Sequence, residues 1–176
     1  MEMTIPKLHV DVRPVTENDI VRLGEQFPMR STPRHAERLR RQQAGSAVYL
    51  IAWHNELPVG YALLKWNGAE DAPVVRHRPG DCPDIEDLFV REEMRSHGIG
   101  TQILQAAEKL ARERGCKMIG LSVSATDNDR ARRLYEHLGY GDAGFGAYVE
   151  CGEYVDPQGQ KHCWEEVCIY LVKRLG

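Results

Sequence analysis

A short glycine-containing segment, residues 95–100, has the residue types needed to hold a phosphate group. Its sequence is R-S-H-G-I-G, and it stands directly before a stretch with helical periodicity. Gly98 and Gly100 permit backbone conformations that other residues avoid and let a ligand approach the main chain. The first amides of a helix lack intrahelical acceptors, and the helix dipole favours an anion there. The segment therefore predicts a diphosphate cradle of main-chain N–H groups, to which Arg95 and His97 can add charge.

Two better-known phosphate loops do not match this segment. A P-loop requires a Gly-Lys-Ser/Thr ending, which is absent, and a dinucleotide fingerprint requires a third glycine where Ile103 stands. A nucleotide-phosphate module built on residues 98–101 stays open, as does a helix start that binds no ligand. The segment alone therefore indicates an anion site without naming the anion.

The segment lies between a predicted strand and a predicted helix of an α/β domain. The T-x-x-D pattern at Thr16–Asp19 predicts the N-terminus of the first helix. Thr126 and Asp129 predict a capping box at the start of the last helix. The order predicts one domain, residues 1–176, with a mixed central sheet of six to seven strands flanked by helices, antiparallel at its start and parallel in its middle. The predicted strands are residues 8–15, 46–54, 59–66, 84–90, 117–124, 140–150 and 163–171, and the other predicted helices are residues 33–44, 98–114 and 127–138.

Three blocks of the chain, in this order and spacing, resemble the GCN5-related N-acetyltransferase (GNAT) superfamily. They are IEDLFV at residues 85–90, R-x-x-G-x-G at residues 95–100, and N-x-x-A-x-x-L-Y at residues 128–135, which runs into Leu-Gly-Tyr at residues 138–140. The resemblance implies acetyl-CoA or a related acyl-CoA as cofactor. It also implies the fold of that superfamily, in which two parallel central strands splay to admit the pantetheine arm.

The third block carries the expected general acid. Asn128, Ala131 and Tyr135 recur at i, i+3 and i+7, which is one face of a helix. The resemblance makes Tyr135 the acid that protonates the departing thiolate, and it places Asn128 at the pantetheine or phosphate region. A phenol of pKa about 10 protonates a thiolate of pKa about 8.5 only if the transfer is coupled to its departure. The alternative is a half-buried tyrosine with its hydroxyl in water.

The first block carries the expected base, which is needed because an alkyl amine has a pKa near 10.4. Strand alternation puts Glu86 on one face, with Leu88 and Val90, and Asp87 on the other face, unless a bulge intervenes. The strand resembles that of spermidine/spermine acetyltransferases, in which the glutamate before the aspartate is the base. The resemblance therefore assigns the base to Glu86, directly or through a water. The alternative is a strand-edge carboxylate paired with a nearby arginine.

The same resemblance assigns the cofactor contacts. The main chain of residues 88–90 is expected to bind the pantetheine amides, with one N–H facing the thioester oxygen. No metal site is expected. The expected cofactor-binding residues are Leu88, Phe89, Val90, Arg95, Ser96, His97, Gly98, Ile99, Gly100, Thr101 and Asn128.

A small cationic amine is the expected acceptor, because acidic residues gather in and before the strand at residues 84–90. Arg76 and Arg78 in the same loop weaken this expectation, and an ordinary charged loop is the alternative. Trp53 and Trp66 fit either a substrate pocket or the core. A protein or peptide acceptor and a non-catalytic acyl-CoA sensor stay open as well. The acidic residues are Glu70, Asp71, Asp81, Asp84, Glu86 and Asp87.

Composition limits the class of partner. The chain has 176 residues, 42% of them hydrophobic and 28% charged, with a net charge of -3, so no overall basic field favours nucleic acid or an anionic membrane. Only residues 34–41, RHAERLRR, are strongly basic, and they fit a solvated helix face or, alternatively, a nucleic-acid contact. We expect a small-molecule partner and leave a homodimer open.

The cysteines and the first residues indicate a cytoplasmic chain. The five cysteines include no C-x-x-C pair and are expected to be free thiols, although a metal site near Cys151, His162 and Cys163 is an alternative. The chain has no apolar run of signal-peptide or membrane-spanning length.

Overall fold

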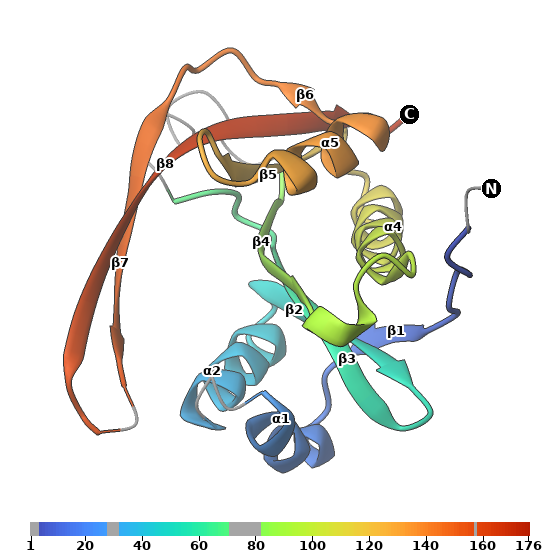
Figure 1. Cartoon of the computed structure of the whole chain (residues 1–176), viewed down its shortest axis with the longest axis vertical. Helices are drawn as coiled ribbons and strands as arrows, with labels where there is room; N and C mark the ends of the chain where they lie inside the picture. Colours follow the sequence, from blue (N-terminus) through green and yellow to red (C-terminus); the bar gives the residue numbers. More distant parts are fainter. Residues whose placement is uncertain (1–3, 28–31, 71–81, 157) are drawn as a thin grey trace. The chain divides into compact units, whose positions relative to one another are not determined.

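The structure is a computed structural model that describes residues 4–27, 32–70, 82–156 and 158–176. It divides into two compact units. One is Met1–Trp66 with Ile85–Gly115, and the other is Asn67–Asp84 with Cys116–Gly176. Strands and helices make up both units (Figure 1). No helix among the described residues combines the length and the apolar character that crossing a membrane would require.

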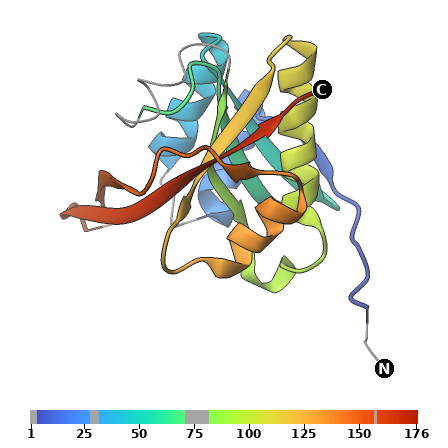
Figure 2. The same ribbon diagram turned by 90° about the horizontal axis from the view of Figure 1, so that it is seen from above.

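The first unit is a sheet with helices on both faces. Its strands lie in the order β1 (Asp11–Pro14), β2 (Ala47–His54), β3 (Leu57–Lys65) and β4 (Asp84–Val90), and β2 is antiparallel to β1 and to β3. In Figure 2, α4 lies on one side of these strands and the two N-terminal α-helices lie on the other. The helices are η1 (Glu17–Asp19), α1 (Ile20–Gln26), α2 (Thr32–Gln43), η2 (Glu92–Met94) and α4 (Ile99–Glu113).

Helices on both faces explain why β2 and β3 are apolar almost throughout instead of alternating. Their core residues pack against those of α1 and α2, and α4 buries the predicted face that includes Ile99, Ile103 and Ala107. The residues of one hydrophobic core cluster are Val15, Ile20, Leu23, Phe27, Leu39, Ala47, Tyr49, Ile51, Trp53, Tyr61 and Leu63.

Gly60 in β3 is a point of close approach. A Cβ at this position would stand 2.7 Å from the carbonyl oxygen of Phe89 in β4 and 3.0 Å from Cδ1 of Ile103 in α4. Since real Cβ atoms do not tolerate 2.7 Å, only glycine lets these three elements meet here.

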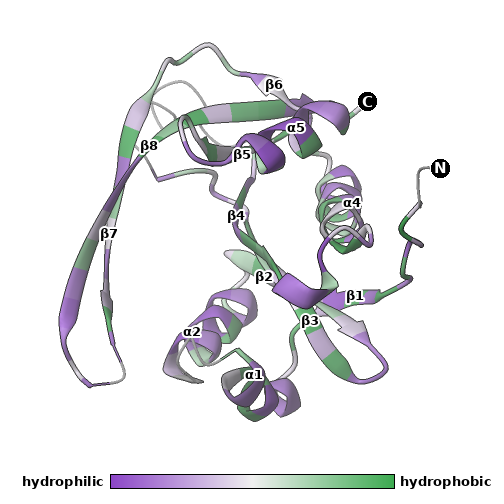
Figure 3. Cartoon of the chain, in the orientation of Figure 1, coloured by the Kyte–Doolittle hydropathy of each residue, from purple (hydrophilic) through white to green (hydrophobic). Residues whose placement is uncertain are grey.

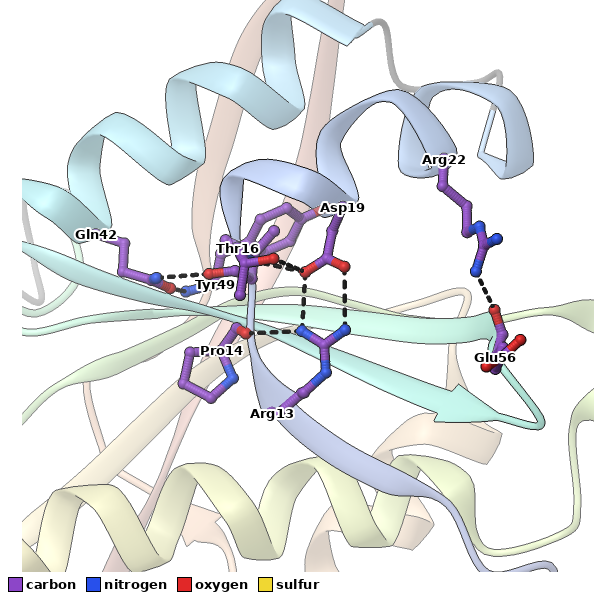
Figure 4. Close-up of polar contacts among 9 residues, drawn as sticks. Arg13, Pro14, Thr16, Asp19, Arg22, Gln42, Tyr49 and Glu56 are labelled. Atoms are coloured by element: carbon purple, nitrogen blue, oxygen red, sulfur yellow. Dashed lines mark hydrogen bonds and ion pairs between the residues drawn. The ribbon is translucent and has the colours of Figure 1, made fainter.

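The predicted helix start at Thr16 is confirmed. The Asp19 carboxylate accepts hydrogen bonds from the Thr16 amide at 2.7 Å and from the Thr16 hydroxyl at 2.8 Å (Figure 4). Arg13 of β1 donates to the two oxygens of the same carboxylate at 2.8 and 3.0 Å. Although burial favours the neutral acid, these hydrogen bonds outweigh it and hold the pKa of Asp19 below its ordinary value.

The second unit is a sheet centred on β8. Strand β8 is antiparallel to each of its three partners, β5, β6 and β7. The predicted strand at residues 140–150 is wrong in its extent, because left-handed Gly144 (φ 85°) and Gly146 (φ 77°) divide it into β6 and β7. The elements are β5 (Met118–Ser124), α5 (Asp129–His137), β6 (Gly141–Asp142), β7 (Tyr148–Val155) and β8 (Lys161–Arg174), and they bring the described strands to eight instead of six to seven.

A two-stranded ribbon extends from this sheet. Strand β5 pairs with residues 168–174 of β8, whereas residues 161–167 have β7 as their strand partner among the described strands (Figure 1). In Figure 3, β8 is hydrophobic where it pairs with β5 and becomes mostly hydrophilic toward the turn. We call residues 149–155 with 161–167 the ribbon. Its exposed apolar side chains are Val149, Tyr154, Val155, Trp164 and Val167.

Candidate active site

Strand β4 has the predicted bounds but not the predicted alternation. Asp87 has a φ of 57°, which places a left-handed residue inside the strand. Ile85 is buried and Glu86 exposed, as alternation requires, but the following residues up to Val90 are all half-buried. The assignment of alternate residues to two faces therefore fails beyond Glu86, because a left-handed residue redirects the side chains after it as a bulge does.

The acidic residues of β4 have different surroundings. The side chain of Glu86 is 46% exposed, and its Oε2 lies 3.8 Å from Nζ of the buried Lys65, so its partner is a lysine instead of the arginine considered above. The carboxylate of Asp87 lies 2.6 Å from Nη2 of Arg38 in α2. Asp84 is buried and accepts a hydrogen bond from the Tyr170 hydroxyl at 3.0 Å. Of these three carboxylates, Glu86 is the most exposed to solvent.

The segment predicted to hold a phosphate precedes α4 directly. Gly98 is the N-cap, with a φ of 79°, and Ser96 is also left-handed, with a φ of 69°. No residue in the described part of the chain accepts a hydrogen bond from the amides of Ile99, Gly100 and Thr101. Three consecutive main-chain donors at a helix N-terminus fit the oxygens of a diphosphate.

Arg95 connects this segment to β4. Its Nε donates to the carbonyl oxygen of Val90 at 3.1 Å, and its guanidinium lies 5.8 Å from the ring centroid of Phe89. The side chain is exposed and its remaining guanidinium nitrogens point to no acceptor that the structure describes. The segment and the strand thus form one continuous group of expected cofactor residues.

The N-terminal segment braces the same loop, which the sequence did not indicate. The Leu8 amide donates to the His97 carbonyl at 2.9 Å, and His97 Nδ1 donates to the Pro6 carbonyl at 3.0 Å. Gln102 of α4 donates to the Leu8 carbonyl at 2.7 Å and accepts from the Val10 amide at 3.1 Å. These partners lie far apart in the chain, three of the four pairs by 91, 92 and 94 positions, so no local pattern could have revealed them.

Lys7 belongs to this bracing segment. Its Cγ lies 3.2 Å from the place that a Cβ at Gly98 would occupy, so the lysine stem covers the glycine. The side chain is exposed and has no ion-pair partner among the described residues. A cation held at the positive end of a helix is unfavourable unless an anion binds there.

The second unit holds the other two expected site residues. Asn128 is the N-cap of α5 and its Oδ1 accepts from the Ala131 amide at 3.3 Å, so the predicted capping box of Thr126 with Asp129 is wrong. Asn128 therefore precedes the helix instead of lying on its face. Tyr135 is buried, and burial raises its pKa to about 12. No described residue forms a hydrogen bond with its hydroxyl.

The expected site residues thus fall into two groups. Glu86, residues 88–90 and residues 95–101 belong to the first unit, whereas Asn128 and Tyr135 belong to the second. In the first unit the contacts given above join the expected residues, whereas in the second unit Asn128 caps the helix α5 that carries Tyr135.

Several other sequence interpretations change with the structure. Trp53 is a core residue with the Arg13 guanidinium 4.7 Å from its ring centroid, and Trp66 packs against Arg114. The basic stretch at residues 34–41 is not wholly a surface face, because Arg38 is only 4% exposed. The five cysteines are free thiols, as predicted. Asp71, Arg76, Arg78 and Asp81, used above to infer the acceptor, lie outside the described residues.

Comparison with known proteins gives a family for these features. The Acetyltransferase (GNAT) family matches residues 16–140. The bovine (Bos taurus) thialysine N-epsilon-acetyltransferase is 38% identical over 58 residues, which are 33% of this chain and 34% of that protein. This chain therefore matches about a third of the curated relative's length.

Solved acetyltransferases share the fold. An N-acetyltransferase from Staphylococcus aureus Mu50 has a TM-score of 0.70 at 14% identity, over 96% of this chain and 100% of that one. The PaiA N-acetyltransferase of Thermoplasma acidophilum, solved in complex with coenzyme A, has a TM-score of 0.63 at 15% identity, over 95% and 99% of the two chains. These likenesses confirm the expected α/β fold class with a mixed, helix-flanked sheet. Because the family match covers most of the chain, the protein belongs to the acetyltransferase (GNAT) family, the acetyl-CoA-dependent N-acetyltransferases.

Proposed function

We propose that this protein transfers the acetyl group of acetyl-CoA to the nitrogen of an amine in a ternary complex. The observation that carries the proposal is the family match over residues 16–140, which includes the segment before α4 with its free amides. We propose further that the two units together form a single acetyltransferase domain. The family match supports this too, because residues 16–140 include parts of both units.

The residues of the first unit fit the cofactor. The amides of residues 99–101 offer three donors to a diphosphate, and Gly98 adopts a left-handed conformation that other residues disfavour. The exposed Arg95 adds a cation beside them, and the adjacent β4 offers main-chain groups at residues 88–90 for the pantetheine amides. When bound, acetyl-CoA supplies an acetyl thioester whose carbonyl carbon accepts a nucleophile.

Glu86 and Tyr135 handle the protons in this proposal. The solvent-accessible Glu86 takes the proton of the attacking amine, directly or through a water, and a β4 amide stabilises the oxyanion. A C–N bond forms while the C–S bond breaks, and Tyr135 donates a proton to the sulfur. With its pKa raised to about 12 by burial, the phenol is protonated at assay pH and has a proton to give, in a transfer coupled to the departure of the thiolate.

A small cationic amine is the proposed acceptor. Support comes from the exposed carboxylate of Glu86 and from the name of the bovine relative, which describes acetylation of an amino group of thialysine. The wider acidity inferred from the sequence gives less support, because Asp84 and Asp87 are already engaged by Tyr170 and Arg38.

A screen of amines with acetyl-CoA tests the proposal. Purified protein is incubated with polyamines, diamino acids, aminoglycosides and short peptides, and free thiol is measured. We expect release with a small amine and a kcat/KM about 100-fold lower for Glu86→Gln, whereas the exposed Glu93→Gln serves as the matched control. Coenzyme A binding by calorimetry without thiol release would contradict catalysis and favour a sensor. Release with peptides alone would contradict the small acceptor.

We also propose a homodimer formed through the ribbon. Val149 and Val167 are paired across the two strands and are 58% and 43% exposed. An isolated two-stranded ribbon is marginally stable in water, and among the described strands its outer strand β7 pairs only with β8, so one edge of β7 has no described strand beside it. A second copy that covers these valines would stabilise the ribbon.

A further inference from the structure

We infer that Arg38 is a positioning residue: its ion pair with Asp87 holds a left-handed residue in β4 and thereby directs Glu86 and the main chain of residues 88–90. The inference rests on the proposed function, which gives Glu86 and this main chain their roles. It adds a residue from α2, for which the sequence suggested only a surface role.

Asp87 is in a conformation that costs free energy. Its φ of 57° lies in the left-handed region, and no other residue of a described strand, glycine aside, has a positive φ. A non-glycine residue in this region is disfavoured, although aspartate tolerates it better than most. Some contact must therefore hold Asp87 in this conformation.

Arg38 supplies that contact from a buried position. The residue is 4% exposed, and its Nη2 lies 2.6 Å from the Asp87 carboxylate. The guanidinium lies 5.0 Å from the ring centroid of Tyr49 and 5.6 Å from that of Tyr61, so aromatic faces fix its position. Arg38 is buried and Asp87 is half-buried, so removing either partner would leave the charge of the other uncompensated, and the pair ties β4 to α2.

The second nitrogen of Arg38 shows what this arrangement costs. Its Nη1 is buried and has no hydrogen-bond partner among the residues that the structure describes. An unsatisfied buried donor is unfavourable. An apolar side chain at this position could fill the same space without burying such a donor. The pairing with Asp87, together with the contacts to Tyr49 and Tyr61, offsets this unfavourable burial.

The chemical consequence concerns the neighbours of Asp87. The left-handed residue Asp87 follows Glu86 directly and precedes residues 88–90. Its backbone dihedral angles therefore set the direction of the main chain on both sides of it. The pairing also neutralises Asp87, which leaves Glu86 as the open carboxylate of the strand. A conformational change at Asp87 would therefore affect the base and the cofactor strand at once.

Two double variants separate positioning from stability. Arg38→Met with Asp87→Gly and Arg38→Met with Asp87→Ala both remove the ion pair and leave no unpaired buried charge. Only glycine accepts the left-handed conformation freely, so we expect the glycine variant to keep kcat within about threefold and the alanine variant to lose about 5- to 30-fold. Calorimetry should show weaker coenzyme A binding for the alanine variant as well, with melting temperatures measured for both.

A control double variant and the wild type are measured beside the two Arg38 variants, so that each outcome supports or contradicts the inference. Arg112→Met with Glu108→Gln removes another ion pair with a buried carboxylate, in α4, and should change the melting temperature but neither kcat nor coenzyme A affinity. Equal kcat and equal coenzyme A affinity in the two Arg38 variants would overturn the inference. A wild-type chain that releases no thiol with any amine would instead contradict the proposed function itself.

Discussion

Surroundings, more than residue type, decide what each ionisable side chain of this protein can do. Asp84, Glu86 and Asp87 lie within one strand, yet one accepts a tyrosine hydrogen bond, one is exposed and one is paired with an arginine. Tyrosines differ in the same way: burial, reinforced by nearby Asp84, raises the pKa of Tyr170, whereas burial alone raises that of Tyr135. Among these residues, Tyr135 is the proposed proton donor and Glu86 the proposed base.

Tyr135→Phe should lower kcat about 100-fold and leave the KM for acetyl-CoA nearly unchanged, because the change removes a proton donor but keeps the ring. Tyr140→Phe, which alters the ring packed 6.2 Å from that of Tyr135, is the matched control. Steady-state kinetics at the pH optimum measure both. A Tyr135→Phe enzyme with wild-type kcat would remove this tyrosine from the mechanism.

The pH dependence of kcat provides a second measurement at Tyr135. A pKa of about 12 keeps the phenol protonated through pH 10, so the wild type should lose no activity from its ionisation between pH 7 and pH 10. The plots of kcat against pH for the wild type and for Tyr135→Phe should therefore have the same shape between pH 7 and pH 10. A basic limb present in the wild type and missing in Tyr135→Phe would show an ordinary or lowered pKa.

At the scale of elements, the N-terminal segment and α4 act together on the expected diphosphate. Lys7→Met keeps the stem over Gly98 and removes the charge, so coenzyme A should bind about two- to fivefold more weakly at low salt. The difference should shrink at 0.5 M salt, since exposed charges are screened there. Lys109→Met, in the C-terminal half of α4 and 77% exposed, is the control for lost charge. Equal affinities of Lys7→Met and the wild type would exclude Lys7 from the site.

The hydrogen bonds of Asp19 at the start of α1 lead to a prediction about stability. Asp19→Asn should lower the free energy of unfolding by about 1 kcal/mol at pH 7, because it weakens the acceptor used by Thr16 and Arg13. The pKa of Asp19 is lowered in the folded state, so its contribution is complete above the unfolded pKa and is lost as the pH falls through the folded value. Urea unfolding should show a constant difference from pH 8 to pH 5 that shrinks below pH 4. A difference that grows in acid would contradict this assignment.

Structural features that depend on residues close in sequence could be predicted, whereas features that depend on contacts between residues far apart in sequence could not. Strand β4 matches its predicted bounds, and α4 differs by one residue at each end, since Gly98 and Gly115 mark its limits locally. The left-handed Asp87 escaped prediction because its partner Arg38 lies 49 positions away. The bracing of the loop by residues 6–10 escaped it for the same reason.

At the scale of the whole molecule, the ribbon should decide the oligomeric state. Replacing Val149 and Val167 together by threonine keeps β propensity and removes apolar surface. The proposed dimer of this variant should therefore dissociate at a higher protein concentration than that of the wild type. Val21→Thr, a valine 67% exposed on α1, is the matched control. Sedimentation velocity from about 1 to 100 μM measures the change. A wild-type chain that stays monomeric over this range would refute the dimer.

The close approach at Gly60 affects how mutational scans of this protein should be interpreted. A methyl group there would collide with main-chain atoms of the cofactor strand, whereas one at Gly141 would meet no atom within 4 Å. A scan scored by growth alone would thus rank Gly60 with Glu86 and Tyr135, although it touches no reactant. Measuring cellular abundance alongside turnover would distinguish the residue that keeps two strands in contact from those proposed to move protons.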